Sequence, residues 1–159
     1  MKKLIASLII FCCLNSTAQE LKPLKPILDK ALNTNDNGVL AYSLKRCVAL
    51  NSVMGIWMKE KGGTDAAMKD AVKNYFEQAE KLRVLAFQLD TKIEKDRGIK
   101  VSTVDEWLQA NQQLNLSITK LYVERLSQNM TTSGNYFGND TDTKNDVTIC
   151  KDFMGYINK

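Results

Sequence analysis

The sequence predicts an all-α protein: a small bundle of about four helices tied by one disulfide bond between Cys47 and Cys150. Two observations support this fold class. Apolar residues recur at steps of three and four over long stretches, which is the period of a helix face, and no stretch reads convincingly as a strand. In addition, Cys47 and Cys150 each lie on the apolar face of a separate predicted helix.

Residues 1–18 have the features of a cleavable signal peptide. A Lys-Lys pair precedes an apolar run over residues 4–14, and Ser16-Thr17-Ala18 places small residues before a cut at Gln19. The run has about 11 residues, whereas a membrane-spanning helix needs about 20. We therefore expect bacterial export to the periplasm or the exterior, with no transmembrane segment in the mature chain.

A lipoprotein is the main alternative for this N-terminus. Cys12 and Cys13 lie near the end of the apolar run, but Phe11 stands where a small residue should precede a lipidated cysteine. Cleavage would leave residues 19–159 as a single helical domain, with 20 basic and 18 acidic side chains and a net charge of +2. No Lys/Arg cluster forms a sustained stripe, so we expect no nucleic-acid partner.

The predicted helices follow in order along the mature chain. Pro23 and Pro26 restrict the first part to a short piece near residues 26–32, and an Asn-rich loop follows. A helix over residues 39–61 ends at Gly62-Gly63, and Thr64 can cap the next helix. That second helix has a heptad seam, which is typical of helical hairpins and bundles. The seam consists of Met68, Val72, Tyr75, Ala79, Leu82, Ala86, Leu89 and Ile93.

The second half of the chain predicts two further helices. Thr103 and Glu106 form a capping-box pattern, and the helix that they open fades near Met130. Residues 131–146 are rich in Thr, Ser, Asn, Gly and Asp, which predicts a long polar loop. A short last helix follows, with Cys150 on its apolar face.

The two mature cysteines form an even pair, which in an oxidising compartment is most simply one disulfide. Linking Cys47 to Cys150 closes a loop of about 100 residues, which the chain-entropy model values at about 4–5 kcal/mol. Two buried free thiols, or a bridge between molecules, are the alternatives.

The chain has no histidine, and this absence excludes several classes of site. Ser-His-Asp and Cys-His catalytic systems, di-iron bundle sites, c-type haem attachment and imidazole-ligated zinc all require histidine. Two distant cysteines are too few for a thiolate zinc site. We therefore predict no catalytic, cofactor-binding or metal-binding residues.

Carboxylates are the remaining candidates for chemistry. The pairs Asp105–Glu106 and Asp90–Glu94 could serve a glycosidase only if they faced each other across a cleft, and we interpret them as solvated helix-end charges. The run from Asp140 to Asp146 departs from a calcium loop, because Lys144 occupies a ligand position. We expect Asp140, Asp142 and Asp146 to satisfy backbone donors and to cap the last helix.

Tyr136 and Phe137 are the candidate partner contacts. They lie in the polar loop with Gly134 and Gly138 on either side, and exposed loop aromatics can anchor a binding partner. The alternative is that they tuck under the loop. The other aromatics stand at helical spacing, which is typical of core positions.

The segments Leu40–Cys47 and Ile149–Phe153, together with Tyr75-Phe76-Glu77, resemble the small periplasmic immunity proteins that neutralise amidase effectors of type VI secretion. The resemblance implies a non-catalytic inhibitor that plugs an enzyme's cleft, often as a dimer. The long helix after Thr103 and the loop with Tyr136-Phe137 depart from that family's layout.

The sequence therefore predicts an exported, non-enzymatic helical domain that binds a protein or an envelope component, without a cofactor. An amidase-directed immunity protein is a narrower alternative. A carboxylate-dependent cell-wall enzyme is the alternative from another class, and a carrier of a small apolar ligand is a third.

Overall fold

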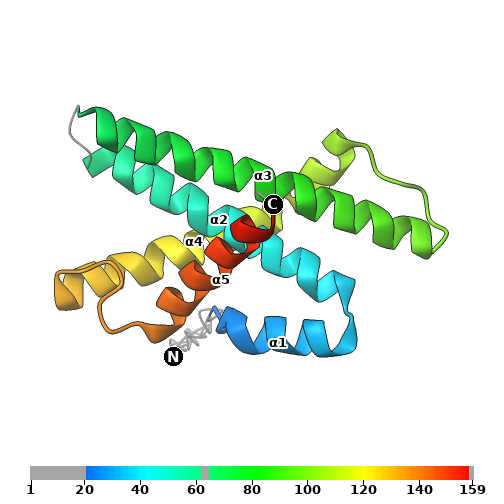
Figure 1. Cartoon of the computed structure of the whole chain (residues 1–159), viewed down its shortest axis with the longest axis horizontal. Coiled ribbons are helices and arrows are strands. Elements are labelled where there is room, and N and C mark those ends of the chain that lie inside the picture. Colours follow the sequence, from blue (N-terminus) through cyan, green and yellow to red (C-terminus); the bar gives the residue numbers. More distant parts are fainter. Residues whose placement is uncertain (1–20, 62–64, 158–159) are drawn as a thin grey trace, which may run out of the picture.

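The structure is a computed structural model that describes residues 21–61 and 65–157. In this part of the chain it is all-helical, as predicted, with helices α1 (Leu24–Thr34), α2 (Asn37–Lys61), α3 (Ala66–Asp96), α4 (Val104–Ser133) and α5 (Thr141–Ile157) (Figure 1). The predicted signal peptide, residues 1–18, and the predicted Gly62-Gly63 stop lie outside the described residues.

Five helices are described where about four were predicted, and the additional one is α1. Pro26 lies in the first turn of α1, where backbone N–H groups have no partner inside the helix. A proline there removes no helical hydrogen bond. The restriction that the two prolines suggested therefore does not prevent a helix of 11 residues.

Helix α2 is the centre of the bundle and contacts each of the other four helices. Residues 46–51 are six consecutive buried positions, so this middle part of α2 is covered on all sides rather than on one face. A helix of this kind is a core helix, around which amphipathic helices assemble.

Helices α2 and α3 form a long antiparallel hairpin (Figure 1). Every residue of the predicted heptad seam is buried or half-buried, and Ala79, Leu82 and Ala86 are fully buried. Close approach also depends on Gly55, because a Cβ atom there would lie 3.1 Å from the ring of Phe76. The cap of α3 is Asp65, whose carboxylate accepts a hydrogen bond from Met68 N (2.7 Å). The predicted cap, Thr64, lies outside the described residues.

The prediction of a long polar loop over residues 131–146 was wrong, because α4 continues to Ser133 and α5 begins at Thr141. The hydroxyls of Thr131, Thr132 and Ser133 donate to carbonyl oxygens one turn earlier in α4, so these polar residues are accommodated within the helix. Gly134 then ends α4 in the left-handed conformation with φ of 68°. The connecting loop is reduced to residues 134–140.

The disulfide joins Cys47 of α2 to Cys150 of α5, as predicted. Helix α5 lies across α2 and also contacts α1 and α3 (Figure 1). The bond therefore fixes the last helix of the chain to the central one. Within the described ranges, no helix combines the length and apolar character needed to cross a membrane.

Candidate functional site

A fully buried polar cluster joins three helices at the centre of the bundle. Arg46 of α2, Tyr122 of α4 and Asp146 of α5 are each completely shielded from solvent. The Arg46 guanidinium donates to the Tyr122 hydroxyl oxygen from Nε (3.2 Å) and Nη2 (3.0 Å), and it forms an ion pair with Asp146. The Tyr122 hydroxyl in turn donates to Asp146 Oδ2 (2.7 Å).

The segment before and at the start of α1 completes this cluster. Arg46 Nη1 donates to the carbonyl oxygen of Lys22, and the backbone N of Leu24 donates to Asp146 Oδ1 (3.0 Å). Burial raises the pKa of the Asp146 carboxyl, against the lowering effect of Arg46, and burial also raises the pKa of Tyr122. Because the cluster is closed to solvent, a substrate cannot reach it. Its role is to hold α1, α2, α4 and α5 together.

A second polar cluster, largely buried, holds the start of α4 against α2 and α3. Asp90 Oδ2 accepts a hydrogen bond from Trp107 Nε1 (2.7 Å) and forms an ion pair with Lys45 Nζ (2.7 Å). The Lys45 ammonium also lies 5.6 Å from the centre of a Trp107 ring. The interpretation of Asp90 as a solvated charge was therefore wrong, because its cross-helix partners cover it.

The predicted carboxylate pairs have separate structural partners. Glu94 accepts hydrogen bonds from the backbone N (2.8 Å) and hydroxyl (2.7 Å) of Ser102, which lower the pKa of its carboxyl. Glu106 forms the predicted capping box with Thr103 and an ion pair with Lys100 (2.6 Å). These bonds, with Lys100 contributing most, lower the pKa of Glu106 to about 2. A general acid at neutral pH needs a raised pKa, so neither glutamate suits that role.

The Glu106→Gln variant tests the charge of this capping box. The pKa of Glu106 is about 2 in the folded protein, below the ordinary value of 4.5. The ionised carboxylate therefore stabilises the fold fully above pH 4.5, and this contribution is lost as the pH falls toward about 2. Urea unfolding of wild type and Glu106→Gln should be compared from pH 6 down to pH 2. The difference between their free energies of unfolding should be constant down to about pH 4.5 and should then decrease. A difference that does not change with pH would contradict the assigned ion pair.

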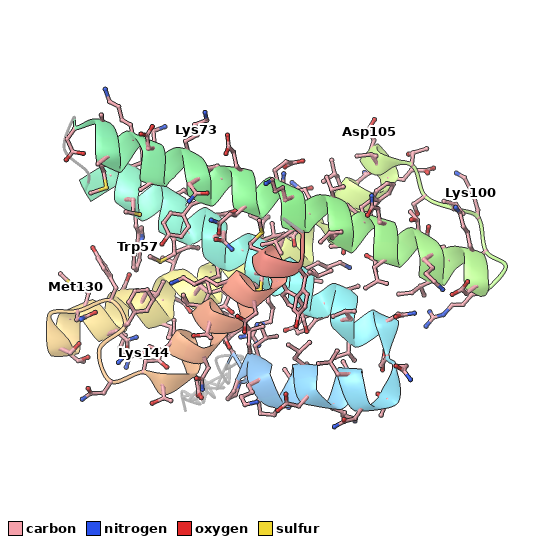
Figure 2. All side chains as sticks on the ribbon, in the orientation of Figure 1. Trp57, Lys73, Lys100, Asp105, Met130 and Lys144 are labelled. Atoms are coloured by element: carbon pink, nitrogen blue, oxygen red, sulfur yellow. A yellow bond between two sulfur atoms is a disulfide. The ribbon has the colours of Figure 1, made fainter. Side chains whose placement is uncertain are left out.

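The candidate contacts Tyr136 and Phe137 are half-buried and pack against the core. The Tyr136 ring lies 4.4 Å from that of Trp57 between centroids. Figure 2 shows Trp57 extending from α2 toward the loop that joins α4 and α5. Asn129 Nδ2 also donates to the Tyr136 carbonyl oxygen (3.0 Å). The loop is therefore held in place by its own aromatic residues, each of which keeps part of its surface exposed.

Asp140, Asp142 and Asp146 do not converge on a common point. Asp140 accepts from Thr143 N (3.0 Å) at the start of α5, as expected of a cap, and it pairs with Arg125 at 3.2 Å. Asp142 lies 3.7 Å from the same arginine, whereas Asp146 belongs to the buried cluster with Arg46. In the described part of the chain, no group of three or more His, Cys, Asp or Glu residues is placed to hold a metal ion.

The first half of α4 presents an uncharged, partly apolar face, which we call the α4 face. Residues 107–119 contain no charged side chain, although charged residues make up 25% of the chain. Leu108 is 38% exposed and Leu116 is 56% exposed. A shallow hollow of about 420 Å³ runs along this face and is bordered by Leu108, Gln109, Gln112, Leu116 and Thr119 of α4 and by Arg83 of α3.

Two more hollows lie where α2, α3 and α5 meet. An apolar groove of about 550 Å³ is bordered by Leu40, Leu44, Leu85, Leu89, Phe153 and Tyr156. A smaller hollow of about 290 Å³ lies nearer the disulfide, and Phe137 forms part of its wall. Sequence reasoning identified Phe137 but missed the hollows and the buried cluster, because their residues come from helices far apart in the sequence.

Comparisons of this chain with protein-family models, with curated proteins and with solved structures find no match.

Proposed function

We propose that this chain is an exported, non-catalytic domain that binds a partner protein through the α4 face. The observation that carries this proposal is the exposure of Leu108 and Leu116 within a helical segment that has no charged residue. An exposed helix normally presents charged and polar side chains on its outer face. Depletion of charge around exposed apolar residues is instead typical of the core of a protein interface.

Helix α3 of the same protein provides the contrast. Its outer side carries charges of both signs, including Lys73 and Glu77, which form an ion pair one turn apart. Lys73 points away from the bundle (Figure 2). The neutral α4 face is therefore a property of this one segment and not of the whole surface.

The chemistry of the α4 face matches a protein partner. Gln109 and Gln112 place amides beside the exposed leucines, and amides can donate and accept hydrogen bonds at the rim of an apolar contact. Arg83 borders the same hollow, and arginine is enriched in protein interfaces. Export rests on the features of residues 1–18, and the disulfide between Cys47 and Cys150 is consistent with an oxidising compartment.

Site-specific photo-crosslinking in the native envelope tests this proposal. A photoreactive residue at position 108 should give one recurrent adduct with another protein, whereas the same residue at position 73 should not. Adding Leu116→Glu should reduce the position-108 adduct tenfold or more, which corresponds to about 1.4 kcal/mol of binding energy. Lys73→Glu is the control, because it changes charge at an exposed site outside the α4 face.

Other outcomes would overturn the proposal. Identical adducts at positions 108 and 73 would indicate non-specific contact, and no adduct at position 108 would remove the α4 face as a binding surface. An adduct only with a second copy of this chain would make the face a dimer interface. Tyr136 and Phe137 remain a second predicted contact, which labelling at position 137 would test in the same way.

One observation favours the narrower immunity-protein proposal. The disulfide links an early helix to the last helix. The immunity proteins that the sequence resembles are likewise helical, with one cysteine in an early helix and another near the C-terminus. On that proposal, the protein crosslinked at position 108 is a cell-wall amidase, and adding this purified chain inhibits its hydrolysis of peptidoglycan. A crosslinked partner without amidase activity would reject the narrower proposal and retain the broader one.

A further inference from the structure

The 290 Å³ hollow beside the disulfide, which we call the α2–α5 hollow, has the features of a small-ligand site. Helices α2, α3 and α5 and the loop before α5 form its walls, and Cys150 is one of the lining residues. Its apolar part includes Leu50, Met54, Met58 and Phe137. Methionine side chains adapt readily to the shape of a bound apolar group.

Asn51 provides a free hydrogen-bond acceptor in this hollow. The residue is only 6% exposed, and it borders the α2–α5 hollow. Its amide nitrogen donates to the carbonyl oxygen of Cys47 (2.9 Å). Because a carbonyl can only accept, the amide group cannot be reversed. Asn51 Oδ1 accepts no hydrogen bond from the described residues and is open to solvent. A ligand with an N–H or O–H group would satisfy this oxygen.

Lys151 gives the hollow a positive charge. It is the one charged residue among those that border the α2–α5 hollow, and it forms no ion pair with the described part of the chain. Of the other polar residues of the wall, Asn74 and Gln78 hydrogen-bond to each other (3.1 Å), and Tyr75 contributes a phenol group. A single ammonium matches one negative charge, whereas phosphate groups are usually held by several donors.

We propose that the α2–α5 hollow binds a small apolar carboxylic acid that carries one hydrogen-bond donor, such as an N-acylated apolar amino acid. The donor bonds to Asn51 Oδ1, the apolar group packs on Met54 and Met58, and the carboxylate pairs with Lys151. The volume lies near the lower limit for ligand pockets, so the ligand is about the size of one acylated amino acid. This site lies outside the α4 face, and the two proposals can fail independently.

N-acetyl-L-leucine is the probe for this site, with N-acetyl-L-leucinamide as its uncharged analogue. The mature, oxidised chain labelled with ¹³C at its methionine methyl groups should show saturable shifts at Met54 and Met58. The signals of Met68, Met130 and Met154 should not move, because these residues do not border the hollow. For a ligand of this size we expect a Kd on the order of 1 mM or below.

Two variants separate the proposed roles. Lys151→Gln should raise the Kd of the carboxylate at least threefold and leave that of the amide unchanged. Asn51→Leu removes the acceptor and should weaken both ligands, and its far-ultraviolet circular dichroism and melting temperature report whether it still folds. No shift of Met54 and Met58 at about 10 mM probe, well above the expected Kd, would overturn the proposal. Equal binding of both ligands by the wild-type chain would also overturn it.

Discussion

Replacing Arg46 with methionine is expected to lower the free energy of unfolding by about 3–5 kcal/mol. The substitution leaves the Asp146 carboxylate fully buried without its cation, and it removes two hydrogen bonds to Tyr122 and one to Lys22. Folded domains are usually stable by only about 5–15 kcal/mol, so this loss is a large fraction of the total. Urea unfolding at neutral pH measures it.

Asp146→Asn and the double variant Arg46→Met/Asp146→Asn complete a double-mutant cycle. The amide introduced by Asp146→Asn can still accept the hydrogen bond from Leu24 N, and the double variant buries no charge. It should therefore lose less stability than the sum of the losses in the two single variants.

The stability of Arg46→Met should also depend on pH. Removing the Arg46 guanidinium removes a positive charge that lowers the pKa of Asp146. The deficit of Arg46→Met relative to wild type should shrink as pH falls and the carboxyl is protonated. Simple additivity at all pH values would show that the two residues act separately.

Local patterns in the sequence predicted the helices well, because each pattern depends only on residues that are close together in the chain. The seam from Met68 to Ile93 follows the helix period, and the structure buries or half-buries every member of it. The Thr103–Glu106 capping box needs only residues three apart, and both of its hydrogen bonds are present. The disulfide was also predicted, since it required only an even number of cysteines on apolar helix faces.

The residues that the sequence did not reveal depend on contacts between distant segments. Arg46 lies 76 residues from Tyr122 and 100 from Asp146, so no spacing rule connects them. Asp146 was therefore assigned only to capping. The polar residues after Met130 were assigned to a loop by composition, yet hydroxyls in Thr131, Thr132 and Ser133 can bond back to their own helix. Composition cannot distinguish these two uses of threonine and serine.

Removing the disulfide through Cys47→Ala/Cys150→Ala is expected to lower the free energy of unfolding by about 2–5 kcal/mol. The cysteines are 103 residues apart, so most of the chain gains freedom in the unfolded state when the bond is absent. Denaturation of wild type with and without reductant is the matched comparison, because it changes no side-chain volume. Equal stability of the oxidised and reduced wild type would contradict the expectation.

The disulfide and the buried cluster hold the same helix, since Asp146 and Cys150 lie one turn apart on α5. If either loss releases α5 from α2, then Arg46→Met should cost less stability in the disulfide-free chain than it costs in the wild type. The same release removes one wall of the α2–α5 hollow, which includes Cys150 and Lys151. Reduction should then weaken binding of N-acetyl-L-leucine at Met54 and Met58 but leave the position-108 crosslink largely intact, because α4 supplies that face. Loss of both activities together would show that α5 supports the whole bundle rather than one site.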